Sequence, residues 1–420
     1  MIEWHLITGE YPPQTGGVSD HTRLIATKLA SAGDRVRVWC PSLKVGEAEE
    51  VEQIKHETKE TEQAKYAGDA DVRGDVVVRR ECGGFAPSDL RRVGRLLNQY
   101  PAPRRLLVQY VPHAYGYRSM NLAFCLWLWK RARFSGDEIE IILHEPFLEW
   151  RRGAWKQTGA AAVHRVMTAT LLRAATRVWT TIPAWEPLWR PFTLGRRVSF
   201  EWLPVPNNIE VQDDVARVSA ARRRYASRRE HVVVGHLGTY PQHVADYLRR
   251  LLPTLLSRQP SAVVVLMGRQ GERVRDEIAS LHPSLAARVH ATGYLAAREL
   301  SAHLSACDLM LQPFTDGVSS RRTSVMAALE HARPVVTTAG RLTEALWAES
   351  GAVALAPADR LDALLEAVER LMADADARAR LGEAGRALYY KHFDAAHAVA
   401  ALRRVAVATE RVASEALLMS

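Results

Sequence analysis

The fold is indicated first by residues 3–40, which read EWHLITGEYPPQTGGVSDHTRLIATKLASAGDRVRVWC. The stretch Glu3–Thr8 predicts a strand, and the loop that follows it is rich in proline and glycine. We expect Asp20 to cap a helix that stops at Gly33, and we expect a second strand over Arg35–Cys40. A strand, a glycine loop, a helix and a second strand form a mononucleotide-binding unit, which predicts a parallel α/β sheet.

Strand-like and helix-like patterns alternate in the rest of the chain as well. The stretch Pro204–Asn208 has the composition of a linker, so we predict two doubly wound halves with a hinge near residue 205. The polar residues 45–75 are interpreted as an exposed insertion. The other predicted strands are 75–79, 106–110, 140–143, 178–182, 198–203, 231–237, 262–267, 309–312, 334–338 and 352–356. Helices are predicted at 243–257, 359–373, 375–390 and 394–415.

The composition of the chain is that of an ordinary globular protein. Its 420 residues are 47% hydrophobic and 25% charged, which excludes a disordered, collagenous or coiled-coil protein. The four cysteines are far apart and form no CxxC pair, so neither a zinc site nor a disulfide framework is expected, and a reduced cytosol fits best. The N-terminus lacks the pattern of a signal peptide, and no apolar run is long enough to cross a bilayer.

The net charge of +9, from 56 Lys+Arg against 47 Asp+Glu, calls for an explanation. Residues 151–200 hold nine Lys+Arg against the single acid Glu186, together with Trp155, Trp179, Trp185 and Trp189. Together with the segment Leu126–Arg131 (LWLWKR), these residues predict that the protein binds an anionic membrane surface through residues 126–197. The alternative is that the tryptophans are core residues and the arginines form a solvated face. No nucleic-acid-binding motif is present, and nucleic acid is not expected as a partner.

The segment Gln312–Ser324 (QPFTDGVSSRRTS) is the best candidate site in the second half. It joins a buried strand to a helix, at the strand end where open α/β sheets bind ligands. A helix start offers free N–H groups to a diphosphate; Ser319 and Ser320 add hydroxyls, and Arg321 and Arg322 add guanidinium groups. The alternative is an N-cap serine followed by two solvated arginines.

Two features of the first half also lie at strand ends. Gly16 and Gly17 end the loop after the first strand, where glycine lets backbone approach a ligand closely; the alternative is a simple turn. His144 follows the apolar strand 139–143 and is a candidate to bind substrate hydroxyls or phosphate; the alternative is a structural histidine.

Several motifs together resemble a known family. The opening Gly9–His21 (GEYPPQTGGVSDH) is similar to the N-terminal signature of the family-4 retaining glycosyltransferases, and Pro334–Thr338 with Gly340 and Glu344 is similar to their donor-domain core. The tail 373–384, followed by Phe393 at the start of a last helix, also fits. The resemblance implies the GT-B fold, with two facing Rossmann-like domains. It places an acceptor domain at 1–204, a nucleotide-sugar donor domain at 209–390, and at 391–420 a C-terminal helix that packs back on the N-terminal domain.

The sequence departs from the family at two glutamates spaced eight residues apart, whose positions hold Ser319 and Ala327. Glu330, one helical turn further on, is a candidate to replace the ribose contact, or else is solvent-exposed. Asp316 or Ser319 is a candidate for the sugar contact. Basic residues usual after the first donor-domain strand are replaced by the segment 235–240 (GHLGTY), in which Gly238 is a candidate donor-binding residue. Arg321 and Arg322 are then the nearest cationic replacements.

The resemblance implies transfer of a sugar from a nucleoside-diphosphate sugar to an acceptor hydroxyl, with retention of the anomeric configuration and without a metal or other cofactor. The acceptor would be a small molecule or a lipid-linked glycan, in the assembly of polysaccharide, glycolipid or secondary metabolite. We expect a cytoplasmic protein, peripheral at the inner face of the membrane. Two alternatives stay open: a sugar-nucleotide-binding protein that keeps the fold without catalysis, and a nucleotide-sugar epimerase.

Overall fold

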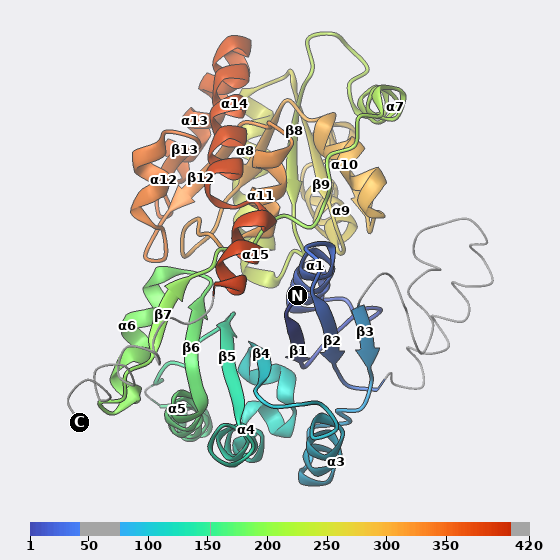
Figure 1. The fold of residues 1–420 in the computed structure, drawn as a ribbon. Helices are drawn as coiled ribbons and strands as arrows, with labels where there is room; N and C mark the ends of the chain where they lie inside the picture. Colours follow the sequence, from blue (N-terminus) through green and yellow to red (C-terminus); the bar gives the residue numbers. More distant parts are fainter. Residues whose placement is uncertain (43–75, 152, 405–420) are drawn as a thin grey trace. The chain divides into compact units, whose positions relative to one another are not determined.

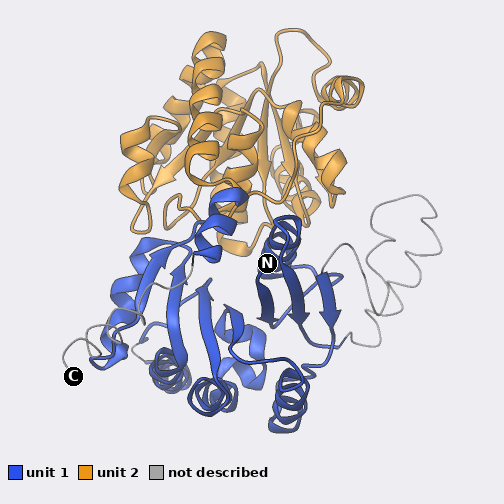
Figure 2. Ribbon diagram, in the orientation of Figure 1, with its two compact units in different colours: residues 1–204, 395–420 blue, residues 205–394 orange. Residues whose placement is uncertain are grey.

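The computed structural model describes residues 1–42, 76–151 and 153–404. They fold into two compact units, which Figure 2 distinguishes by colour. The first unit takes residues 1–204 and the chain from 395 onwards, and the second takes residues 205–394. The expected insertion 45–75 and the predicted helix beyond residue 404 lie outside the described residues.

The first unit is built on a seven-stranded parallel sheet, in the order β3-β2-β1-β4-β5-β6-β7 (Figure 1). Its strands are β1 (Glu3–Thr8), β2 (Arg35–Trp39), β3 (Val76–Arg79), β4 (Arg104–Tyr110), β5 (Asp137–Leu143), β6 (Ala175–Thr180) and β7 (Ser199–Trp202). Its helices are α1 (Gly17–Ser31), α3 (Pro87–Leu97), α4 (Leu122–Phe134), α5 (Trp155–Ala174), α6 (Glu186–Trp189) and α15 (Ala395–Arg403).

The second unit holds a six-stranded parallel sheet in the order β10-β9-β8-β11-β12-β13. Its strands are β8 (Val232–Leu237), β9 (Ala262–Met267), β10 (Val289–Gly293), β11 (Leu309–Gln312), β12 (Val335–Ala339) and β13 (Ala354–Pro357). Its helices are α7 (Val215–Tyr225), α8 (Gln242–Arg258), α9 (Gly271–Leu281), α10 (Ala297–Ser305), α11 (Thr323–Glu330), α12 (Ala345–Ser350), α13 (Leu361–Ala373) and α14 (Ala375–His392). The predicted α/β class with two parallel sheets is confirmed.

The C-terminal helix α15 belongs to the first unit, although the second unit precedes it in the chain. Ala398, Val399 and Leu402 are buried in one apolar cluster with residues of β1, β4 and α1. Arg403 pairs with the buried Asp34 at 3.2 Å, which fixes the end of the helix. The expected return of the chain to its N-terminal half is therefore confirmed for residues 395–403.

Two predicted helix ends are wrong. The first helix begins at Gly17 and not after Asp20, because the Glu10 carboxylate accepts a hydrogen bond from the backbone N–H of Ser19 at 2.9 Å and so takes over the capping. Phe393 does not open the last helix; it follows the end of α14, fully buried, with its ring stacked on that of Trp347 at 5.4 Å. In the first case the capping group comes from the preceding loop, and in the second the residue after the helix is buried in a ring stack.

Candidate functional site

The segment 313–322 joins β11 to α11 at the carboxyl end of the second sheet, and we call it the donor loop. Its start is held by β12, since the Thr338 hydroxyl accepts from the Phe314 N–H and donates to the Phe314 carbonyl. Gly317 has a φ of +88°, and a Cβ there would lie 2.3 Å from the backbone nitrogen of Gly340. A side chain at Gly317 would therefore both strain the backbone and push the neighbouring loop away.

Asp316 is the counter-ion of both candidate arginines. One carboxylate oxygen accepts from Arg321 at 3.2 Å, and the other accepts from Arg322. The Arg322 guanidinium also lies over the ring of Phe314, 4.4 Å from its centroid. The two arginines are about three-quarters buried, so they are oriented side chains and do not form an ordinary solvated face.

The two serines of the donor loop have different surroundings. Ser319 is fully buried, and within the described residues its hydroxyl has no hydrogen-bond partner. Ser320 donates its backbone N–H to Glu344 at 3.0 Å and also donates its hydroxyl to that carboxylate. Glu344 accepts in addition from the indole N–H of Trp347 at 2.7 Å. Glu344 thus ties the donor loop to α12, a role that sequence reasoning did not predict.

Glu330 lies at the opposite end of α11 from the donor loop. Its carboxylate accepts a hydrogen bond from the Asn207 amide at 2.6 Å and interacts with the Tyr389 hydroxyl. Burial raises the pKa of Glu330 above its usual range. These contacts hold the linker after residue 204 to α11 and α14, so we leave Glu330 out of the proposed donor site. Ala327 is fully buried inside the unit.

Gly238 lies just past β8, where three strand ends meet closely. Its N–H donates to the Met267 carbonyl at 3.0 Å, and its own carbonyl lies 2.1 Å from where a Cβ on Gly268 would stand. Beside it, burial lowers the pKa of His236 to about 3, so this ring is neutral near pH 7. The segment 235–240 therefore contributes close backbone packing and no positive charge.

In the first unit, a carboxylate already lies where the glycine pair was expected to meet a ligand. Gly16 precedes α1, and a Cβ on it would stand 2.3 Å from Oε1 of Glu10. The same Oε1 accepts from Ser19 inside the first turn of the helix. A side chain at position 16 would displace this carboxylate from the helix start, whereas a Cβ on Gly17 would meet no atom within 4 Å.

His144 directly follows β5 and forms a cluster with two residues that sequence reasoning did not select. Its Nε2 lies 2.8 Å from Oε1 of Gln109, and Nδ1 of His21 lies 3.2 Å from the same oxygen. Burial lowers the pKa of His21 to about 4 and that of His144 well below its usual value. The signal for Gln109 was available: it is a polar residue near the end of the otherwise apolar run 106–110.

The tryptophans of the basic segment are mostly core residues. Trp179, Trp185 and Trp189 are buried, whereas Trp155 is 79% exposed. The interpretation of these tryptophans as one membrane-facing set is therefore wrong for three of the four. The outer side of α4 carries a different stripe, which spaces exposed or partly exposed apolar and basic residues three or four positions apart: Leu126, Trp129, Lys130, Arg133 and Phe134.

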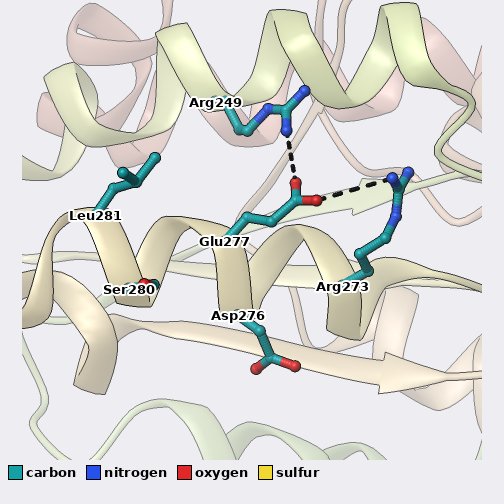
Figure 3. Close-up of a pocket in the computed structure, with 6 residues that line it drawn as sticks. All are labelled: Arg249, Arg273, Asp276, Glu277, Ser280 and Leu281. Atoms are coloured by element: carbon teal, nitrogen blue, oxygen red, sulfur yellow. Dashed lines mark hydrogen bonds and ion pairs between the residues drawn. The ribbon is translucent and has the colours of Figure 1, made fainter.

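A surface cavity of about 700 Å³ lies between α8 and α9 (Figure 3). Glu277 occupies its centre and pairs with Arg249 at 2.8 Å and with Arg273 at 3.8 Å. Its charges are thus already matched, and it holds none of the candidate residues. Among the described helices, none is long and apolar enough to cross a membrane.

Comparison with known proteins gives the same fold. Residues 228–374 match the family model "Glycosyl transferases group 1". A search of curated proteins finds no significant match. Among solved structures, sucrose-phosphate synthase from Thermosynechococcus elongatus aligns with a TM-score of 0.67 at 15% identity, over 100% of both chains.

Two further solved structures are similar. Anabaena HepE in complex with UDP and glucose aligns with a TM-score of 0.64 at 16% identity, over 96% of this chain and 98% of that one. WaaG, a glycosyltransferase involved in lipopolysaccharide biosynthesis, aligns with a TM-score of 0.60 at 13% identity, over 96% and 100%. Residues 228–374 thus match the group 1 glycosyl transferase model, and the two α/β units of the chain have the GT-B fold of these glycosyltransferase structures.

Proposed function

We propose that the protein transfers a sugar from a nucleoside-diphosphate sugar to an acceptor hydroxyl, with retention of the anomeric configuration and without a bound metal. The observation that carries the proposal is the donor loop: two oriented arginines and two serines at the carboxyl end of β11 and the start of α11. HepE, which shares the fold, was solved with UDP and glucose. Retention rests on the resemblance of residues 9–21 and 334–344 to retaining enzymes.

The chemical task is to stabilise the negative charge that grows on the departing diphosphate. Guanidinium groups suit this task, because they hold phosphate oxygens in pairs and stay charged. The N-terminal end of α11 adds the positive end of a helix dipole. In the proposed complex the diphosphate takes over the contacts with Arg321 and Arg322 that Asp316 makes in the structure. Asp316 and Ser319 then face the sugar.

His144 supplies the proposed contribution of the first unit. It lies at the carboxyl end of β5, which is the side of a parallel sheet where ligands bind. A neutral imidazole with one bare nitrogen accepts a hydrogen bond from a sugar hydroxyl. We therefore assign it a substrate contact, and assign phosphate binding to the donor loop.

For the acceptor we propose a lipid-linked glycan at an anionic membrane surface, reached through the stripe on α4. Phe134 is 71% and Leu126 is 42% exposed, and Lys130 and Arg133 are exposed between them. Exposed apolar side chains beside lysine and arginine are typical of helices that rest in the headgroup region of a bilayer. This places the protein, by proposal, at the inner face of the membrane.

The activity is tested by incubating the protein with a panel of nucleoside-diphosphate sugars, with and without lipid extract, and following nucleotide release and the glycosylated product. Release that depends on an acceptor supports the transferase. Conversion of one nucleotide sugar into another without release supports an epimerase, and binding of nucleotide without any turnover supports the non-catalytic alternative. No binding of any nucleotide contradicts all three.

The membrane contact is tested by sedimentation with vesicles of phosphatidylcholine, with and without phosphatidylglycerol. We expect the protein to bind only the anionic vesicles, and the variant Leu126→Ser/Phe134→Ser to lose about 1–3 kcal/mol of binding free energy. The matched control is Leu281→Ser, which removes a 69% exposed leucine from the second unit. Equal binding of wild-type protein to neutral vesicles, or an equal loss in the control, contradicts the proposal.

A further inference from the structure

Two histidine rings and one amide meet at the carboxyl ends of β4 and β5. Gln109 is the last residue but one of β4, His144 follows β5, and His21 comes from the start of α1. The two imidazole centroids are 4.8 Å apart with their planes at 79°. Both rings direct a nitrogen at the same oxygen of Gln109, at 2.8 Å from His144 and 3.2 Å from His21.

This geometry fixes the position of one proton on each ring. An amide oxygen accepts hydrogen bonds and does not donate them, so both nitrogens that face it carry a proton. Burial lowers the pKa of both rings, which keeps each neutral near pH 7 with a single N–H. His21 is then protonated on Nδ1 and His144 on Nε2, and the bare nitrogens are Nε2 of His21 and Nδ1 of His144.

The cluster is not what stability alone would favour. Within the described residues, the amide nitrogen of Gln109 and Nε2 of His21 are buried without a hydrogen-bond partner. Buried polar atoms without partners destabilise a folded protein, and apolar side chains would fill the same space without that cost. An unsatisfied polar cluster at the ligand-binding edge of a sheet is instead expected where it orients a functional group.

The geometry points to Gln109 and His21 as positioning residues for His144, which hold its ring so that Nδ1 stays a bare acceptor for a substrate hydroxyl. This inference rests on the proposed function, in which His144 contacts the sugar. In the described part of the chain Nδ1 of His144 has no partner, and the ring is only partly buried. His21 keeps the Gln109 amide from rotating, because its oxygen then accepts two N–H groups at once.

The test measures histidine tautomers in the free, full-length protein by NMR, from the ring ¹⁵N and ¹³C shifts of selectively labelled histidine. Signals are assigned by their loss in His21→Asn and His144→Asn. We expect His21 as the Nδ1–H form and His144 as the Nε2–H form at pH 7. Gln109→Met removes the acceptor, so His21 is expected to lose its fixed Nδ1–H form. Gln312→Met changes a fully buried glutamine at the end of β11 and leaves both tautomers unchanged.

An Nε2–H form of His21 in the wild-type protein overturns the inference, and so does a Gln109→Met spectrum with unchanged tautomers. The wild-type spectrum decides this even if the variant does not fold. In the transfer assay, Gln109→Met is expected to lower kcat/KM about tenfold, the effect of one lost hydrogen bond, with UDP affinity within twofold of wild type. An unchanged kcat/KM also overturns it. A wild-type protein that transfers no sugar contradicts the proposed function and leaves the tautomer result standing.

Discussion

The carboxylate of Glu344 accepts both the backbone N–H and the hydroxyl of Ser320, which lies 24 residues earlier in the chain. This pair makes the donor loop part of a longer connected set. Glu344 also holds the indole of Trp347, on which Phe393 stacks, and the Ser320 carbonyl accepts from the N–H of Val205. Val205 is the first residue of the second unit and Phe393 is next to its last. The loop that we propose to bind the diphosphate is thus tied to both ends of its unit.

Glu344→Gln is expected to weaken this set, because an amide cannot accept from three donors as a carboxylate does. The loss is about 1–3 kcal/mol of unfolding free energy, measured by urea denaturation, with a weaker affinity for nucleoside diphosphate measured alongside it. Glu349→Gln, on the exposed side of the same short helix, is the matched control. A Glu344→Gln protein that keeps wild-type stability and affinity would show that the pair is incidental.

Asp316→Asn is expected to tighten the binding of a nucleoside diphosphate while lowering turnover. The substitution removes the internal charge that competes for Arg321 and Arg322, so we expect affinity to rise about three- to tenfold, with a steeper dependence on salt. Titration calorimetry at two salt concentrations measures the affinity and its dependence on salt. Weaker binding in this variant would mean that Asp316 orders the arginines for the ligand and does not compete with it.

Asp137 is the buried charged residue of the first unit whose removal we expect to cost the most stability. Its side chain is fully buried between the guanidinium groups of Arg104 and Arg131, each of which donates to a different carboxylate oxygen. Asp137→Ala leaves two buried cations without their partner and is expected to cost about 3–5 kcal/mol of stability. Glu138→Ala, an exposed neighbour on the same strand, serves as the control in thermal unfolding. Equal melting temperatures in the two variants would rule this account out.

The stability of the second unit is expected to fall as the pH is lowered from about 6.5. Burial lowers the pKa of His236 to about 3 in the folded state, while the unfolded chain keeps a value near 6.5. Between these values the unfolded state binds the extra proton, so each pH unit of acidification favours unfolding by up to about 1.4 kcal/mol. His236→Phe removes this group, so its melting temperature should change less between pH 7 and pH 5 than that of the wild type. His282→Phe, an exposed site, should follow the wild type.

Much of the fold follows from local pattern. The continuous apolar run Ala262–Met267 forms a buried strand, as its sequence predicts. The linker near residue 205 marks the end of the first unit's main segment. The strand β10 was missed because its sequence, VHATG, is short and its apolar residues are interrupted by His290 and Thr292. Asp20 was wrongly chosen as a cap because the true capping group, Glu10, reaches the helix from the preceding loop. Such contacts depend on tertiary structure.

The candidate site was only partly predictable for the same reason. The donor loop was found from its place between a strand and a helix and from its residue types. The structure also shows contacts that the sequence did not predict, because the residues come together only on folding. These are the ion pairs of the two arginines with Asp316, the hydrogen bond of Ser320 to Glu344, and the hydrogen bond of Asn207 to Glu330. Trp179 and Trp189 show the same limit, because composition does not tell which face of an element is buried.

The central claim, that the donor loop binds the diphosphate of a nucleotide sugar, is tested most directly by calorimetric titration with UDP, GDP, ADP and CDP. We predict that the wild-type protein binds at least one of them, and that Arg321→Ala/Arg322→Ala weakens this binding at least about tenfold, because two charge-assisted contacts are lost. The control is Arg223→Ala/Arg224→Ala, an exposed arginine pair on α7 of the same unit, which should bind as wild type does. No binding by the wild type, or equal affinity in the two double variants, would contradict the claim.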